Sequence, residues 1–285
     1  MRVSPPKVFP VATRSAKPSV DVAGSADAYR QTSFVLGEEV ELVLRGLNLE
    51  GLVAAASAGA KFRSQQTAAA LGLWSRSWLC RIQALHAAEW GGYSAAMPLV
   101  RAAADYSGGM VYLLRQDAVE WEEWLEGGGV SLAAAQHATE FRLHTFRAAE
   151  ALAGDETLGP IYRAATDLSL PHFGATLLLA GGDSGPGHVA MTFGDRDFHV
   201  GFAELLFGWL VELSAWHLRI AAAFPSAFGA LESVGAGSDF LVAADTMRSR
   251  PTRCRIEHID VDGSPRYLVH NLRRAPGAAP KRVLL

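Results

Sequence analysis

Apolar residues recur at three- and four-residue steps along most of the chain, the spacing that forms one face of an α-helix. The clearest example is 64–90, where Trp74 and Trp78 stand one turn apart and two glycines follow the segment. The full pattern predicts helices near 34–45, 64–90, 93–114, 131–153, 156–168 and 198–223. We therefore expect a mostly α protein built as a multi-helix bundle.

Two of these helices differ in how much of their surface should be covered. The residues of 93–114 are apolar on nearly every side, so this helix is expected at the centre of the bundle, bent at Pro98. The segment 198–223 has an amphipathic pattern and is expected to bury one face.

Strand signals occur at two places. The apolar runs 175–179 and 188–193 flank a glycine-rich turn and predict a small inserted β hairpin. A second short hairpin is expected at the C-terminus, around the turn that begins at Asp262-Gly263.

Three regions follow from these patterns: an irregular arm at 1–30, a helical-bundle domain at 31–232 and a basic appendage at 233–285. Charge separates them, because residues 246–285 carry a net charge of +6 and residues 1–30 one of +3 within a chain whose total is −3. A basic end on an acidic body can bind nucleic acid, or it can fold against its own domain or a neighbouring subunit. We favour the latter pair over nucleic acid.

Composition also bears on the compartment. The first residues lack the apolar run of a signal peptide, and charged residues interrupt the two longest apolar segments, 93–114 and 202–224. The chain has two cysteines, Cys80 and Cys254. We expect a cytoplasmic protein with reduced thiols and no membrane partner, and, because tryptophans commonly anchor interfaces as well as cores, we expect self-association.

One histidine cluster resembles a metal or proton-transfer site. A helix would place His137, Glu140 and His144 within an arc of roughly 60°. His86 and Glu89 repeat the His-x-x-Glu spacing on another helix, and paired helices of this kind build two-metal sites in bundles. These five residues are the candidate ligands of a divalent transition metal, with His144, Glu140 and His86 as catalytic candidates. The alternatives are histidines that only form hydrogen bonds and general acid-base catalysis without metal.

Two further features are candidates for binding or chemistry. Arg101 and Asp105 are charges one turn apart in an apolar helix, so they form either a structural pair or the anion-binding wall of a cofactor pocket. His172 and His199 bracket the expected inserted hairpin, and His172 is a fourth catalytic candidate. The alternative is that both histidines cap helix ends or hold the hairpin in place.

Two runs resemble segments of uncharacterised bacterial helical proteins: GYSAAMPLVRAAAD at 92–105 and YRAATDLSLPH at 162–172. Some of those proteins look like the HEPN superfamily, many of whose members are RNases or nucleotide-binding toxins. The resemblance implies a small helical domain. HEPN RNases carry Arg, a polar residue, a spacer and His near the start of a late helix. Here Arg81 and His86 have the spacing but an apolar second residue, and in Arg196–His199 the spacer is too short.

Together these observations favour an interaction or small-ligand-binding module that forms a homo-oligomer. The alternatives are a metal-dependent helical-bundle enzyme that uses the His/Glu cluster and a HEPN-like RNase or nucleic-acid-associated protein.

Overall fold

The computed structural model describes residues 3–9, 11–57, 64–115, 152–182, 184, 187–228 and 236–285. Its helices are α1 (Ser25–Val35), α2 (Gly37–Ala56), α3 (Gln65–Glu89), α4 (Tyr93–Arg115), α7 (Leu158–Ser169), α8 (Phe173–Ala180), α9 (Val200–Ala223), α10 (Pro225–Phe228) and α11 (Ala236–Arg248). Its strands are β1 (Arg255–Val261), β2 (Ser264–Leu272) and β3 (Lys281–Leu284). The predicted mostly α bundle with a short C-terminal β hairpin is confirmed.

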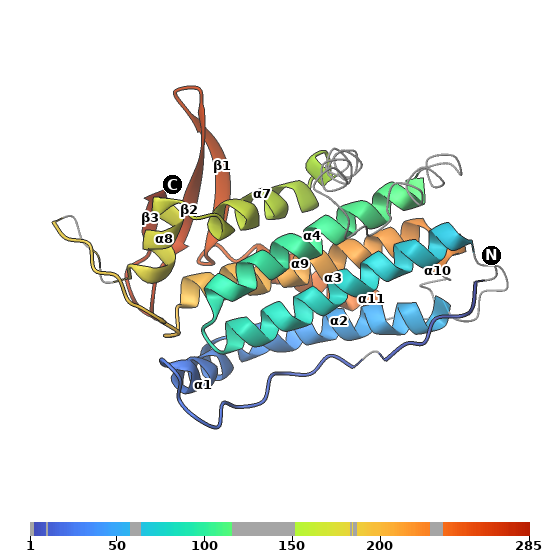
Figure 1. Cartoon of the computed structure of the whole chain (residues 1–285), viewed down its shortest axis with the longest axis horizontal. Helices are drawn as coiled ribbons and strands as arrows, with labels where there is room; N and C mark the ends of the chain where they lie inside the picture. Colours follow the sequence, from blue (N-terminus) through green and yellow to red (C-terminus); the bar gives the residue numbers. More distant parts are fainter. Residues whose placement is uncertain are drawn as a thin grey trace, which may run out of the picture.

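The long helices α2, α3, α4 and α9 run side by side and form the body of the molecule (Figure 1). The sheet stands at one end of this bundle, next to α8 and the C-terminus (Figure 1). The N-terminal segment runs along the outside of the bundle and reaches α1 at the opposite end from where it starts (Figure 1). Residues 25–30, expected in the irregular arm, already belong to α1.

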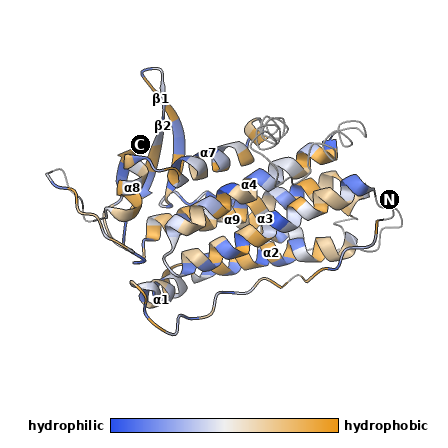
Figure 2. Cartoon of the chain, viewed as in Figure 1, coloured by the Kyte–Doolittle hydropathy of each residue, from blue (hydrophilic) through white to orange (hydrophobic). Residues whose placement is uncertain are grey.

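Helix α9, rather than the 93–114 helix, occupies the centre of the bundle. It contacts α2, α3, α4, α10, α11 and the strands β1 and β2. Figure 2 shows mostly hydrophobic residues along it. Helix α4 instead leaves Ser94, Ala95 and Pro98 exposed. Small alanines made α4 appear apolar on every side, whereas the two glutamates of α9 concealed how fully that helix is buried. Among the described helices, α9 is also long and apolar enough to cross a membrane, and 72% of its apolar window is buried in the fold.

Helix α3 ends at the predicted glycines, and its start has a cap that was not predicted from the sequence. Ser64 caps the first turn by accepting a hydrogen bond from the Thr67 N–H at 3.0 Å. After Glu89 the chain turns through Gly91, whose φ is 70°. A Cβ atom at this position would lie 1.9 Å from the carbonyl oxygen of Arg196, so both the conformation and the close approach require glycine.

The predicted inserted hairpin is wrong: among the described residues, neither 175–179 nor 188–193 forms a strand. The run 175–179 lies inside helix α8. A short apolar run looks the same in a buried strand and in a buried helix, so its period could not separate the two.

The C-terminal hairpin forms as predicted. Strands β1 and β2 pair in antiparallel register from Arg255 opposite His270 to Val261 opposite Ser264. Asp262 and Gly263 connect them with φ of 54° and 78°, the two positive values that a type I′ turn requires. Strand β3 adds to the free edge of β2 and gives the order β1-β2-β3.

The basic C-terminal segment folds against the acidic body, one of the two arrangements expected from charge. Its arginines form ion pairs with carboxylates of the helices and of the loop before α9: Arg248–Glu212 at 2.7 Å, Arg253–Glu39 at 2.6 Å, Arg273–Glu204 at 2.5 Å and Arg274–Asp197 at 3.1 Å. Glu39 and Glu204 are nearly buried, so these pairs supply the counter-charges that the two carboxylates need away from water.

Gly46 lets α2 approach α9 and α11, and this contact gives a first prediction. A Cβ atom at position 46 would lie 2.7 Å from Phe240 Cζ and 2.8 Å from Ser214 Cβ. We expect Gly46→Ala to lower the free energy of unfolding by about 1–3 kcal/mol, because overpacking outweighs the gain in helix propensity. Urea unfolding measures this. Gly37→Ala is the control, since a Cβ there meets no atom within 4 Å, and equal stability of the two variants would contradict the prediction.

Candidate functional site

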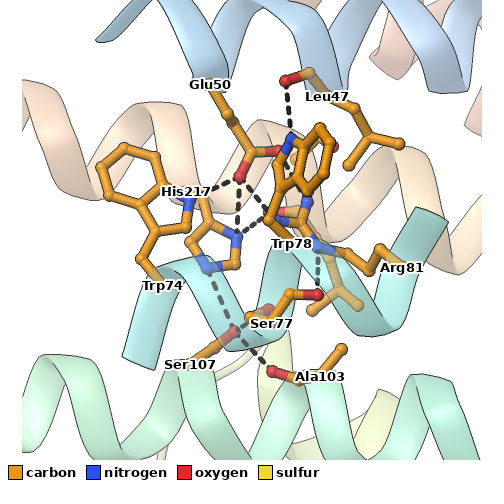
Figure 3. A network of polar contacts seen from close by, with 11 residues as sticks. Leu47, Glu50, Trp74, Ser77, Trp78, Arg81, Ala103, Ser107 and His217 are labelled. Atoms are coloured by element: carbon orange, nitrogen blue, oxygen red, sulfur yellow. Dashed lines mark hydrogen bonds and ion pairs between the residues drawn. The ribbon is translucent and has the colours of Figure 1, made fainter. Parts of the chain in front are cut away.

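Polar side chains from four helices meet in the centre of the bundle (Figure 3). We call this group the core cluster; it comprises Glu50, Ser77, Arg81, Ser107, Ser214 and His217. Every member is at most 1% exposed. Burying an ion or a hydroxyl costs free energy unless the group is paired, so each member needs hydrogen-bond partners inside the bundle.

Glu50 and Arg81 form a bidentate ion pair. Arg81 Nη1 lies 2.6 Å from Glu50 Oε1, and Nη2 lies 2.5 Å from Oε2. Nη1 also donates to Ser214 Oγ at 2.9 Å, and Nε donates to the carbonyl of Ser77 at 3.3 Å. Trp74 Nε1 donates a further bond to Glu50 Oε2 at 2.5 Å. The pair is therefore satisfied from three helices.

Helix periodicity explains how a charge enters the core. Positions 74, 78, 81 and 85 lie on one stripe of α3, and Arg81 is the charged residue among two tryptophans and a leucine. Glu50 likewise follows Leu47 on the inward face of α2. A charged residue at an otherwise apolar position of each helix, Glu50 in α2 and Arg81 in α3, is the sequence signal that would have predicted the core cluster.

His217 continues the cluster toward α4. Its Nδ1 lies 2.7 Å from the carbonyl oxygen of Leu213, which can only accept, so Nδ1 carries the proton. In a neutral ring Nε2 is then the acceptor for the hydroxyl of Ser107 at 3.1 Å, and Ser77 Oγ lies 3.1 Å from Ser107 Oγ. The Ala103 carbonyl, 2.7 Å from Ser107 Oγ, is the alternative acceptor. Trp74 stacks on the imidazole with ring centroids 5.4 Å apart.

The pKa values in the cluster follow from burial and from Arg81. Burial opposes the charge of Glu50, but the Arg81 charge and the hydrogen bonds from Arg81 and Trp74 outweigh it and lower the Glu50 pKa. Burial, helped by Arg81, lowers the pKa of His217 to about 3. The cluster therefore holds an ionised carboxylate, a guanidinium and a neutral imidazole.

Ser107, His217 and Glu50 have the order of a catalytic triad, but their bonding differs from one. His217 Nδ1 donates to a backbone carbonyl and stands 3.7 Å from Glu50 Oε2, which is already bound to Arg81 and Trp74. Ser107 is fully buried, so no substrate reaches its hydroxyl in this conformation. The geometry fits a structural network.

A cavity of about 450 Å³ adjoins the core cluster between α2, α3 and the N-terminal arm. Glu50 and Trp74 line this cavity. The same two side chains take part in the polar interactions of the core cluster (Figure 3). The other lining residues are Pro6, Lys7, Val8, Phe9, Gly51, Ala54, Ala68, Leu71, Gly72, Ser75, Trp78 and Leu79. The lining is thus mainly apolar and aromatic.

Two of the proposed metal ligands hold the N-terminal arm. Glu89 is fully buried and accepts hydrogen bonds from Arg14 Nε at 2.7 Å and from the Ser15 N–H at 2.9 Å. His86 Nε2 lies 2.8 Å from the carbonyl oxygen of Thr13. No group of three or more metal-ligating side chains occurs in the described part of the chain. His137, Glu140 and His144 lie outside the described residues, so the metal-dependent enzyme stays a prediction.

Arg81 and His86, the pair with HEPN-like spacing, lie in different parts of the structure. Arg81 is buried in the core cluster, whereas His86 contacts the arm.

Arg101 and Asp105 contribute to the packing of α4. Arg101 donates to Thr166 Oγ1 and to the Tyr162 hydroxyl of α7, each at 3.1 Å, and lies over the Tyr162 ring. Burial raises the pKa of Asp105, although the nearby Arg101 opposes this shift. Arg101 thus joins α4 to α7. Neither Arg101 nor Asp105 lines the cavity between α2, α3 and the N-terminal arm.

The two loop histidines differ. His199 caps α9, because its Nδ1 accepts a hydrogen bond from the Phe202 N–H at 3.4 Å, and burial lowers its pKa to about 4. His172 occupies the N-cap position of α8 without a side-chain cap bond and is exposed. The capping alternative therefore holds for His199.

No protein-family model, curated protein or solved structure matches this chain.

The ion pair gives a prediction on stability. Glu50→Leu and Arg81→Met should each lower the free energy of unfolding by about 3–5 kcal/mol, because each leaves one buried charge without its partner. The double variant should lose less than the sum, since it removes both charges. Denaturant unfolding of the four proteins measures the coupling, and strictly additive losses would contradict the pair's role.

The low pKa of His217 gives a prediction on pH. The unfolded chain binds a proton at His217 below about pH 6.5, whereas the folded protein binds it only below about pH 3. Between these two pH values the free energy of unfolding should therefore fall by about 1.4 kcal/mol for each unit that the pH is lowered. His217→Gln should remove this slope relative to wild type, and above pH 6.5 the two proteins should show equal slopes as the internal control. Identical slopes between pH 3 and 6.5 would show that His217 is charged in the fold.

Proposed function

We propose that this protein binds a small, largely apolar molecule in the cavity between α2, α3 and the N-terminal arm. The observation that carries this proposal is the cavity itself, which has Trp74 and Trp78 in its wall, and a further residue of this wall is Gly72. It lies in the interior of α3, where glycine costs about 1 kcal/mol relative to alanine, and a Cβ built there meets no atom within 4 Å. Gly72 is exposed and belongs to the lining of the cavity, so a larger side chain at this position has open space at the cavity wall.

The size and lining of the cavity suit a small organic molecule. Its volume of about 450 Å³ lies in the range of about 300–1,000 Å³ typical of ligand pockets. Leu71, Trp74 and Trp78 line it from α3. Trp74 and Trp78 are held in place by hydrogen bonds from their indole nitrogens to Glu50 and to the Leu47 carbonyl. Fixed aromatic walls of this kind give a ligand surface that needs little ordering on binding.

The charges around the cavity select the class of ligand. Lys7 and Glu50 are the charged residues among its described lining. Arg81 already neutralises Glu50, and Lys7 lies exposed on the arm. A mainly hydrocarbon or aromatic ligand therefore matches the wall better than a highly charged one.

The N-terminal arm forms the outer wall of the cavity, and its residues 12–16 are anchored to the helices by hydrogen bonds. Asn48 bonds both the N–H and the carbonyl of Ala12, at 2.8 and 3.2 Å, and Trp90 donates to the Ala16 carbonyl at 3.1 Å. Residues 6–9 extend beyond this anchored part and cover the cavity. We infer that the ligand enters by displacing residues 6–9 while the anchored part stays bound.

The uncharged fluorescent probe N-phenylnaphthylamine tests the proposal. We expect it to bind the wild-type protein with enhanced emission, and Gly72→Phe to abolish binding by filling the cavity. Gly72→Ala is the matched control: it should keep most of the binding and raise the free energy of unfolding by about 0.5–1 kcal/mol.

Two results would contradict the proposed function. One is saturable binding that Gly72→Phe leaves unchanged, which would place the probe elsewhere. The other is a folded wild-type protein that does not bind the probe at all. Circular dichroism and urea unfolding show that the variants are folded.

A further inference from the structure

The second large cavity lies where α7 and α9 meet the C-terminal sheet and has a volume of about 440 Å³. We propose that it binds an organic anion, a carboxylate or phosphate ester attached to a flat apolar body. This site is separate from the one under Proposed function, and its residues come from other elements.

An apolar and aromatic wall lines one part of this cavity. Trp209 and Leu205 come from α9, Ile161 from α7, and Ile256 and Tyr267 from the sheet. Burial, together with a hydrogen bond to Asp167, raises the Tyr267 pKa and keeps the phenol neutral. A flat apolar group fits such a wall, because aromatic rings offer large contact surfaces with little conformational freedom to lose.

Most charges around the cavity are already paired. Arg248 pairs with Glu212 at 2.7 Å and Arg253 with Glu39 at 2.6 Å. Glu204 accepts hydrogen bonds from Arg273 at 2.5 Å and from the Cys254 N–H at 2.9 Å. The Arg248–Glu212 pair joins α11 to α9, and the other pairs hold the segments that flank the sheet on the bundle. These groups are not available to a ligand.

Two lining guanidiniums remain. Arg163 of α7 and Arg255 of β1 have no acidic partner among the residues that the structure describes. His258 adds an imidazole that lies edge-on to Tyr267, with ring centroids 5.7 Å apart. Glu156 is the one lining carboxylate that forms no ion pair within the described chain, so the remaining cations outnumber it. Guanidinium groups bind carboxylates and phosphates with two parallel hydrogen bonds.

The arrangement depends on the docking of the sheet. Arg163 and Arg255 are far apart in the sequence and line one cavity because β1 packs against α9 and α7 packs against α4. The aromatic wall and the two cations thus come together only in the complete fold. An anionic head group would meet the guanidiniums while its apolar body covers Trp209.

The anionic probe anilinonaphthalene sulfonate tests this site in the Gly72→Phe background, in which the first cavity is filled. We expect saturable binding that Arg163→Gln and Arg255→Gln each weaken about tenfold or more, because each removes a charged hydrogen-bond donor. Both arginines are exposed, so the variants should fold. Competition by benzoate and by phenyl phosphate then distinguishes a carboxylate ligand from a phosphate ester.

Arg282→Gln is the matched control, since it removes the same charge from β3 outside the cavity. Uncharged N-phenylnaphthylamine should bind this site at least about tenfold more weakly than the sulfonate. The proposal is overturned if the sulfonate fails to bind, if Arg282→Gln weakens binding as much as Arg163→Gln and Arg255→Gln do, or if the uncharged probe binds equally well. Loss of binding in the first cavity would leave these outcomes unaffected, because the test is run with that cavity filled.

Discussion

The ion pair between Glu50 and Arg81 fixes how α2, α3 and α9 meet. Both charges are buried, so each needs its partners at hydrogen-bond distance. Moving one helix along its axis by a turn, about 5.4 Å, would break these contacts. The alanine- and leucine-rich faces around them would pack in more than one register. The polar interactions therefore select one arrangement, in the way that a buried polar residue sets the register of a coiled coil.

The same interactions give the first cavity its rigid wall. Trp74 donates to Glu50 and stacks on His217, so the indole that lines the cavity is held by the core on two sides. A binding surface is most selective when a second layer of contacts holds its side chains in place. Here that layer is the centre of the bundle, and the arm, anchored through Glu89 and Asn48, closes the outer side.

Local signals were enough to predict several elements. The glycines that end 64–90 and the Asp262-Gly263 turn depend on neighbouring residues, and both formed where expected. The helix at 198–223 was also located, but its central position depends on which other helices surround it. The hairpin predicted at 175–179 is a helix because a short apolar run carries no decisive period.

The candidate sites were harder to predict, because they join residues that are distant in the chain. Arg81 binds Ser214 across 133 positions, and Arg14 reaches Glu89 across 75. The His-x-x-Glu spacing at His86 and Glu89 suggested metal ligation, yet the same spacing serves to hold an arm. The His-x-x-Glu pattern does not say which segment packs against these two side chains, and only the fold shows that it is the N-terminal arm.

The pairing of the C-terminal arginines with the helices also orders events during synthesis. Glu39 and Glu204 emerge from the ribosome long before Arg253 and Arg273, which neutralise them. Until then these carboxylates have no place in a dry interior, and the α9 surface that the sheet covers stays in contact with water. The helices can associate earlier, but the native body is completed only when the segment that carries Arg253 and Arg273 has been made. A ribosome that stops before residue 253 therefore releases a body whose acidic groups still require solvent.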